Sequence, residues 1–178
     1  MRKLLNEELG RPTLEECATQ DKLPVVIVLD NVRSAQNVGS FFRTADAFGI
    51  GRIALCGISA TPPNREIHKT ALGAEESIGW SYHHTTAECI SKLRDEGYRI
   101  LAIEQVEGAV MLDRFQAEEG TKYAIVFGNE VLGVEQSVVD MCDGAIEIPQ
   151  VGTKHSLNVS VSGGVVLWDF FCQIGLKR

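Results

Sequence analysis

The chain of 178 residues lacks the cysteine and histidine patterns that form zinc or disulfide sites. Its five cysteines are odd in number and lie at least 30 residues apart, without a C-x-x-C pair, so reduced thiols are expected. The four histidines do not show the spacing of metal ligands, either among themselves or with the cysteines. We therefore expect neither a disulfide framework nor a bound metal.

Long apolar runs are also missing. No stretch approaches the 18 consecutive apolar residues of a membrane-spanning helix, and the basic N-terminus lacks the apolar centre of a signal peptide. With 44% hydrophobic and 23% charged residues, the composition is that of a globular chain that can build its own core. These features predict a cytoplasmic protein that does not enter a membrane.

Positive charge is scarce, because 17 Lys and Arg stand against 24 Asp and Glu, for a net charge of −7. Such a balance opposes, on average, the binding of RNA or DNA. The deficit is local, however, since residues 85–147 hold 5 basic and 13 acidic side chains and the rest of the chain is nearly balanced. The charge therefore excludes only a uniformly basic binder and predicts two faces of different electrostatic character.

Short apolar runs alternate with segments of helical periodicity. Before them, residues 1–23 are interpreted as a helical arm, with Thr13 and Glu16 forming a capping box. The alternation is typical of βαβ units and predicts one α/β domain over residues 24–178, with a mostly parallel sheet and helices on both faces. The predicted strands are residues 25–29, 53–56, 99–103, 123–127 and 145–148; the predicted helices are 38–48, 86–96, 135–141 and 157–172.

Three loops are rich in glycine and small polar residues: 30–39, 128–133 and 149–158. Each follows a predicted strand, and ligands of open parallel sheets bind at the carboxyl ends of strands. A competing motif, Gly49 to Ala54, matches the G-x-G-x-x-A dinucleotide pattern, but it follows a helix and enters a strand. A pyrophosphate site needs a strand followed by a helix, because the helix N-terminus binds the phosphates. A Rossmann-type nicotinamide-dependent enzyme is therefore the weaker alternative.

The first loop runs into an amphipathic helix on which Arg43 lies opposite the apolar stripe. One interpretation is a solvated arginine on a surface helix. The other is an anion site, because Asn31, Arg33 and Asn37 precede it at a strand-to-helix junction, where backbone N–H groups and guanidinium groups favour phosphate. This helix alone leaves both interpretations open.

Three segments, in order, resemble motifs 1, 2 and 3 of the SpoU/TrmH-type RNA ribose 2′-O-methyltransferases, which belong to the SPOUT superfamily. The resemblance covers residues 24–172 approximately. Val131 and Gln150 depart from the glycine and methionine of many relatives, which bears on the subfamily more than on activity. The matching residues are Asn37-x-Gly39-x3-Arg43-Thr44-Ala45-Asp46-Ala47-Phe48-Gly49, Gly128-Asn129-Glu130-x2-Gly133, and Ile148-Pro149-x2-Gly152-x3-Ser156-Leu157-Asn158-Val159-Ser160-Val161.

The resemblance implies a C-terminal trefoil knot over residues 123–178 approximately, which periodicity and composition do not predict. It also implies S-adenosylmethionine as cofactor and a homodimer with the active site near its interface. The chain is similar to the short members without a separate N-terminal RNA-binding domain. Carried over by motif position, the residues expected to contact the cofactor are Gly128, Ile148 and Leu157.

The same carry-over gives five candidate catalytic residues. Arg43 is expected to fix a phosphate and lower the pKa of the ribose hydroxyl, because an arginine with a pKa above ~12 does not act as a base. Asn37, Ser156 and Asn158 would orient the ribose and Arg43, and Glu130 would organise the motif 2 loop.

The implied function is S-adenosylmethionine-dependent methylation of a ribose 2′-hydroxyl in RNA, with tRNA favoured over rRNA. The alternative within the family is a non-catalytic RNA-binding protein. Basic residues that could follow the phosphate backbone are each, alone, typical of solvated surface charge, and as a group they favour RNA binding. They are Arg33, Arg65, Lys69 and Lys154, with Arg2, Lys3 and Arg11 in the arm and Lys177 and Arg178 at the tail.

Overall fold

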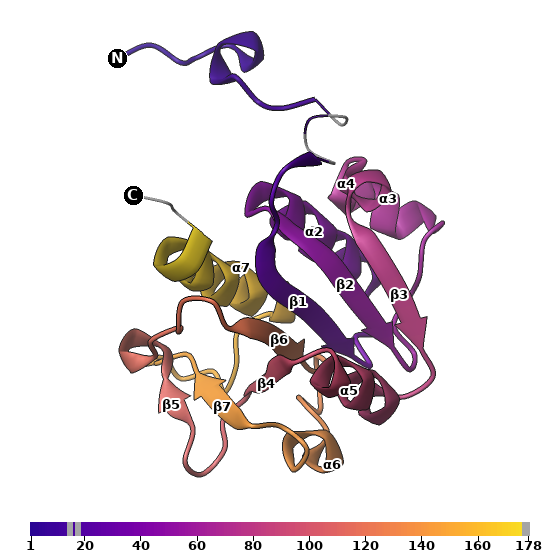
Figure 1. Ribbon diagram of the computed structural model, residues 1–178, viewed down its shortest axis with the longest axis vertical. Helices are drawn as coiled ribbons and strands as arrows, with labels where there is room; N and C mark the ends of the chain where they lie inside the picture. The colour runs from indigo at the N-terminus through magenta and orange to yellow at the C-terminus, as the bar shows by residue number, and fades with distance from the viewer. Residues whose placement is uncertain (14–15, 17–18, 176–178) are drawn as a thin grey trace.

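The computed structural model describes residues 1–13, 16 and 19–175. Within these residues the chain forms a seven-stranded sheet in which every pairing is parallel, in the order β3-β2-β1-β6-β4-β7-β5 (Figure 1). This confirms the predicted α/β class. The strands are β1 (Leu23–Asp30), β2 (Ile50–Cys56), β3 (Gly79–His83), β4 (Tyr98–Ile103), β5 (Val110–Met111), β6 (Lys122–Phe127) and β7 (Gly144–Glu147).

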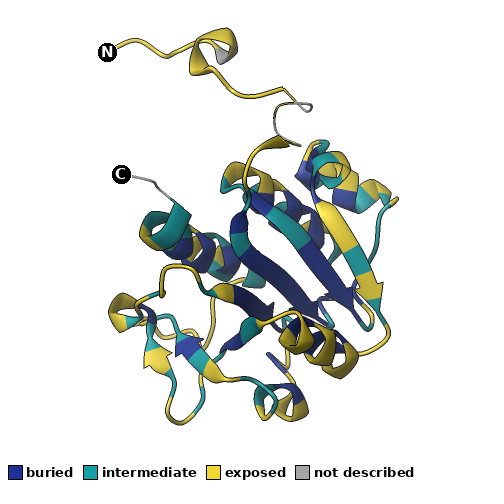
Figure 2. Cartoon of the chain, viewed as in Figure 1, coloured by how far each residue is buried: buried dark blue, intermediate teal, exposed yellow. Residues whose placement is uncertain are grey.

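Alternate side chains of the central strands enter two separate cores, one on each face of the sheet. Ile27 and Leu29 of β1 belong to one apolar cluster, and Val26 and Val28 belong to the other. Because both faces of β1 are covered, it reads as a continuous apolar run rather than an alternating one. Figure 2 shows the resulting block of buried residues at the centre of the sheet.

Helices cover both faces, as predicted. The first cluster takes in buried side chains of α2 (Ala35–Ala47), α3 (Arg65–Ala71), α4 (Ala74–Ser77) and α7 (Val159–Phe170). The second takes in those of α5 (Thr86–Asp95) and α6 (Gln136–Val139). The helix α7 returns from the C-terminal part of the chain to pack on α2, where the Phe41 ring leaves space only for the hydrogen atom of Gly163.

Several elements differ from the sequence predictions. The edge strands β3 and β5 were not predicted, since both are partly exposed and lack an apolar run, and the short helices α3 and α4 were missed as well. The helix α2 begins three residues earlier than predicted because the Ser34 hydroxyl caps it, accepting from the Asn37 amide. At the other end of the chain, α7 starts after its Asn158 cap and continues as a π-helix over Phe171–Gly175.

The N-terminal arm extends away from the sheet and is exposed (Figures 1 and 2). It contains a 3-10 helix over Asn6–Leu9. The predicted capping box is present, with the Thr13 amide donating to the Glu16 carboxylate at 2.8 Å and the Glu16 amide donating to the Thr13 hydroxyl at 3.2 Å. The rest of the predicted arm helix, at 14–15 and 17–18, lies outside the described residues, as do Lys177 and Arg178.

Every helix in the described part of the chain is too short or too polar to cross a membrane. The same residues contain no group of three or more His, Cys, Asp and Glu side chains arranged to hold a metal ion. Four cysteines are free thiols, and the fifth, Cys17, lies outside the described residues. The free thiols are Cys56, Cys89, Cys142 and Cys172.

Candidate active site

The three glycine-rich loops meet beside the carboxyl ends of β1, β6 and β7. The Glu130 carboxylate, in the loop after β6, reaches across to the loop after β1. It accepts hydrogen bonds from the backbone amides of Arg33 and Ser34, both at 2.9 Å, and from the Asn37 side-chain amide at 2.9 Å. Glu130 thereby binds the donors at the start of α2, where a negative charge is favoured by the helix dipole.

The environment of Glu130 keeps this carboxylate ionised. Partial burial opposes ionisation, but the donors from Arg33, Asn37 and Ser34 outweigh it, so that the pKa of Glu130 is lowered from its ordinary value. These hydrogen bonds join Glu130 to the motif 1 loop, and its expected role in organising the motif 2 loop stays a prediction.

Asn37 links the first two motifs to the third. Its side-chain amide donates to Glu130, and its Oδ1 accepts from the Asn158 side chain at 3.3 Å. The Oδ1 of Asn158 in turn accepts from the backbone amides of Ser160 and Val161 and so caps α7. Three predicted site residues from three distant segments therefore form one hydrogen-bonded chain.

The motif 2 loop is held in shape by side chains that the sequence analysis did not single out. Within the loop, Asn129 Oδ1 accepts from the Val131 and Leu132 amides, and the Asn129 side-chain amide donates to the Asn31 carbonyl at 2.8 Å. Because Asn129 joins the loop to the segment after β1, it fixes the position of Glu130 next to it.

Two acidic residues at strand ends also accept hydrogen bonds from the two residues that follow this loop. The buried Asp30, at the end of β1, accepts from the Glu135 amide at 3.1 Å, and Glu104, directly after β4, accepts from the Val134 amide at 2.9 Å. A charged residue directly at the end of an apolar run was the sequence signal that could have identified both.

Arg43 lies apart from this hydrogen-bonded chain. It is exposed on α2, six residues beyond Asn37, which corresponds to roughly 9 Å along the helix axis. Arg43 follows Gly39 by four residues, so at about 100° per residue the two positions differ by roughly 40° around the helix axis. Gly39 lies on the side of α2 that packs against α3. Within the described residues the Arg43 guanidinium makes no hydrogen bond or ion pair, so it is available to an external anion.

A hollow of about 500 Å³ opens next to the three loops, and it is lined by Gly128, Leu157 and Ser156 among others. A smaller adjoining hollow of about 110 Å³ shares Ser156 and Leu157 and adds Ile148. The structure thus brings together all three residues predicted to contact the cofactor. The third loop crosses the segment after β4 here, where the Gln105 side chain donates to the His155 carbonyl at 3.1 Å.

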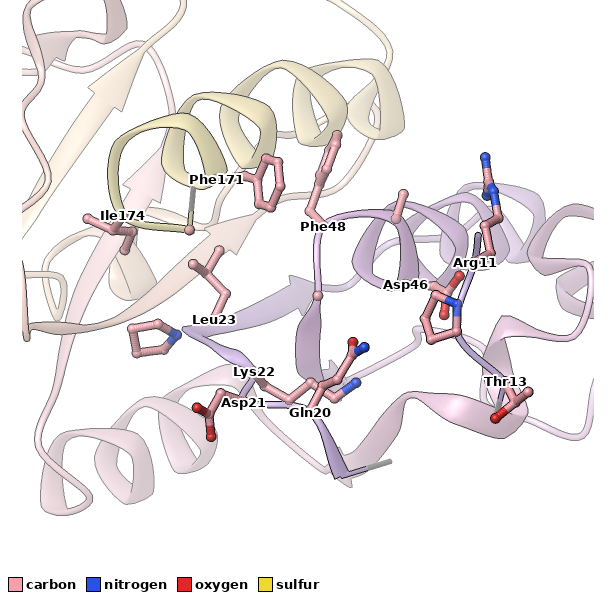
Figure 3. A pocket seen from close by; sticks show the side chains of 15 residues that line it. Arg11, Thr13, Gln20, Asp21, Lys22, Leu23, Asp46, Phe48, Phe171 and Ile174 are labelled. Carbon is pink, nitrogen blue, oxygen red and sulfur yellow. The ribbon is translucent and has the colours of Figure 1, made fainter. Parts of the chain in front are cut away.

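A larger hollow, of about 760 Å³, lies elsewhere (Figure 3). Arg11 and Thr13 of the arm line it together with Asp46 and Phe48 at the end of α2 and with Phe171. It contains no candidate catalytic or cofactor residue. Size alone therefore does not mark the active site, and the smaller hollow beside the motifs is the better candidate.

The residues predicted to contact RNA come from three segments of the chain. Arg33 precedes α2, Arg65 and Lys69 lie on α3, and Lys154 lies in the loop before α7. Lys69 pairs with Glu66 at 2.6 Å, while the side chains of Arg33, Arg65 and Lys154 have no hydrogen bond or ion pair among the described residues. In the arm, Arg2 pairs with Glu8.

The G-x-G-x-x-A motif at Gly49 to Ala54 lies between a helix and the strand that follows it, as the sequence indicated. Gly49, with a φ of 66°, ends the turn after α2, and the following residues form β2. A helix C-terminus with exposed carbonyl groups faces this turn, so the site does not provide the amide donors that bind pyrophosphate.

The lowered pKa of Glu130 predicts a pH-dependent contribution to stability. Ionised Glu130 stabilises the folded chain above the ordinary glutamate pKa of about 4.3, and this stabilisation is lost as the pH falls through the lower folded-state pKa. We expect the difference in free energy of unfolding between the wild type and Glu130→Gln to be largest near pH 7 and to shrink below about pH 4. Urea unfolding across this range measures it, and a difference independent of pH would contradict it.

A parallel sheet, a polar junction at the carboxyl ends of its strands and a C-terminal segment that crosses the other loops define an α/β protein of the SPOUT knot class. A family model described as the SpoU rRNA Methylase family matches residues 24–168. The chain therefore belongs to this family, and the SPOUT fold implied by the sequence resemblance is confirmed, while the extent of its knot, residues 123–178 approximately, stays a prediction.

Three similar proteins illustrate the range of the family. The chain is 30% identical to a 23S rRNA (guanosine-2′-O-)-methyltransferase, RlmB, of Vibrio parahaemolyticus, over 92% of this chain and 65% of the relative. It superposes on the Aquifex aeolicus TrmH/SpoU tRNA modifying enzyme with a TM-score of 0.79 and 23% identity, covering 90% and 80% of the two chains. An AdoMet-bound rRNA methyltransferase of Sinorhizobium meliloti gives a TM-score of 0.76 and 25% identity, covering 84% and 59%. The chain spans 60 to 65% of the length of the curated relatives it matches.

Proposed function

We propose that this protein uses S-adenosylmethionine to methylate a ribose 2′-hydroxyl in RNA, with residues 24–178 as the methyltransferase domain and residues 1–23 as an arm. The observation that carries the proposal is the hydrogen-bonded chain of Glu130, Asn37 and Asn158 beside a hollow lined by Gly128 and Leu157. Family membership and the AdoMet-bound relative support the choice of cofactor.

The residues of the hollow suit this cofactor. Its volume of about 500 Å³ lies within the range of roughly 300–1,000 Å³ that is typical of small-molecule sites. Ile148 and Leu157 offer apolar surface, while the loop around Gly128 offers backbone groups to the adenosine and methionine portions. When bound, S-adenosylmethionine supplies a methyl group on a sulfonium, which is already a good electrophile.

Activation of the ribose hydroxyl is the harder part of the reaction, and we assign it to Arg43. A guanidinium does not give up its proton in a protein, so Arg43 acts by its charge and not as a base. It holds the phosphate next to the target ribose and lowers the pKa of the 2′-hydroxyl, whose proton passes to the phosphate or to solvent. Asn37, Ser156 and Asn158 orient the ribose by hydrogen bonds.

We propose tRNA as the substrate class. The similarity extends over 80% of the Aquifex aeolicus tRNA-modifying enzyme, against 65% and 59% of the two rRNA methyltransferases. Incubation with S-adenosylmethionine and total RNA from a strain without the gene, followed by mapping of 2′-O-methyl sites, tests both the methyl-transfer activity and the substrate class. A new site in rRNA would overturn the substrate class, and the absence of any transfer would favour a non-catalytic RNA-binding protein.

We also propose that two copies of the chain pair through α7. Val161, Val165 and Trp168 follow at helical spacing on one face of α7, and they are 51%, 40% and 52% exposed. Trp168 also packs against Phe48, directly after α2, with ring centroids 5.6 Å apart, so the apolar face reaches the C-terminal end of the helix that carries Arg43. A second copy of this chain would remove this apolar surface from water.

Trp168→Glu is expected to convert the dimer into a monomer, because a carboxylate would be buried without a partner in the paired state. Size-exclusion chromatography with light scattering measures the mass. Val110→Glu, at a 45% exposed position on the edge strand β5, is the matched control and should leave the dimer intact. A wild-type chain that is monomeric at micromolar concentration would exclude the proposed pairing.

A further inference from the structure

A separate hollow of about 580 Å³ lies outside the candidate active site, at the edge of the sheet next to α3. Two prolines and the Trp80 ring give it apolar walls, and charged side chains of both signs also line it. It shares no lining residue with the cofactor hollow. The residues lining it are Pro62, Pro63, Asn64, Arg65, His68, Glu75, Glu76 and Trp80.

Trp80 contributes a partly exposed aromatic surface to the hollow. It lies on β3, the edge strand of the sheet, opposite Ile53 of β2, and it is 40% exposed. An exposed tryptophan at the wall of a hollow is a platform on which a flat ring can stack, and unpaired nucleobases are recognised in this way.

The lining also contains a carboxylate that pairs with a histidine of α3. Glu75 is only 10% exposed, and its Oε1 lies 2.5 Å from Nδ1 of His68. Burial opposes ionisation of Glu75, but the hydrogen bond from His68 contributes to a lowered pKa, so the two side chains form a charge-assisted pair. This pair joins α4 to α3 where both contribute to the lining of the hollow.

The hollow lies beside α3, which packs against α2, the helix at the candidate active site. The Gln36 side chain at the start of α2 donates to Glu66 of α3 at 3.2 Å, which places the N-termini of the two helices side by side. Arg65 is the residue next to Glu66, and its guanidinium has no partner within the described residues. Arg43 lies toward the same α3 side of α2, so a chain of phosphates crossing these two helices would meet both arginines.

We propose that this hollow binds an unpaired base of the RNA substrate, which stacks on Trp80 while Arg65 binds the adjoining phosphate. This inference rests on the proposed function and adds a second contact that positions the RNA. A neutral ring fits the apolar walls, and Arg65 offers a cation to the adjoining phosphate. The carboxylates of Glu75, which pairs with His68, and Glu76 line the same hollow, so a basic peptide is the competing occupant that the experiment has to exclude.

Tryptophan fluorescence tests the base contact directly, since the chain has only two tryptophans. A Trp168→Phe variant, checked to have the wild-type mass, reports on Trp80 alone. Titration with the hexanucleotide A6 is expected to quench its emission, whereas a hexameric abasic ribose-phosphate of equal charge should not. No quenching by A6, equal quenching by both RNAs, or quenching by pentalysine instead would overturn the proposal.

Kinetics separate this inference from the proposed function. Trp80→Ala is expected to weaken A6 binding about tenfold and to raise KM for RNA, with kcat for methyl transfer unchanged. Trp80→Phe should restore most of the affinity, and Tyr82→Ala, a 45% exposed aromatic on the same strand, is the matched control without effect. If the wild type transfers methyl groups and Trp80→Ala has an unchanged KM, the base site is wrong while the enzyme stands. If the wild type transfers none, quenching by A6 still tests the hollow on its own.

Discussion

Replacing Arg43 with alanine is expected to lower methyl transfer by about 100-fold or more, while the affinity for S-adenosylmethionine stays unchanged. The guanidinium is exposed and has no partner within the described residues, so its removal breaks no internal contact and leaves the fold intact. The loss would therefore report on stabilisation of charge that develops on the ribose hydroxyl. Labelled-methyl transfer measures the rate, and calorimetry with S-adenosylhomocysteine measures the cofactor site.

Two control variants sharpen this result. Arg43→Lys keeps the charge but loses the planar fork that binds phosphate through two hydrogen bonds, so partial activity is expected. Arg99→Ala removes an exposed arginine that pairs with Glu118 on another part of the surface, and it should leave transfer unchanged. Wild-type turnover in Arg43→Ala would remove Arg43 from the proposed mechanism.

Gly128→Ala is expected to abolish most of the cofactor affinity, with a loss of more than tenfold, and to lower the free energy of unfolding by about 1–3 kcal/mol. A Cβ at this position would lie 2.1 Å from backbone atoms of Gly133 and Val134, which no side-chain rotation can relieve. The Asn129–Gly133 bridge would have to open, and the loop that lines the hollow would shift. Thermal shift with and without S-adenosylhomocysteine measures both effects.

Gly164→Ala is the matched control for this change. A Cβ there meets nothing within 4 Å, and alanine is the better helix former, so stability should rise slightly and cofactor binding should be retained. A Gly128→Ala variant that binds S-adenosylhomocysteine as well as the wild type would show that the hollow beside motif 2 is not the cofactor site.

The sequence predicted those elements in which local pattern and final environment agree. The strands around Ile27 and Ile125 are buried on both faces, so their apolar runs were visible without the fold. The edge strand that carries Trp80 was missed for the opposite reason, because its mixed, half-exposed pattern resembles a loop. Trp80, which provides the aromatic surface of the inferred base site, was therefore missed as well.

The sequence by itself determined the α/β class, the three polar loops and, through the order of their motifs, the family. Only the tertiary structure decided how these loops meet. Glu130 accepts hydrogen bonds from Arg33, Ser34 and Asn37, which lie more than 90 residues before it in the sequence. Asn158, which is even further from Asn37 in the sequence, donates to Asn37 and completes the hydrogen-bonded chain. Hydrogen bonds between such distant residues depend on the strand order and on the return of α7 to α2, and no local periodicity encodes that return.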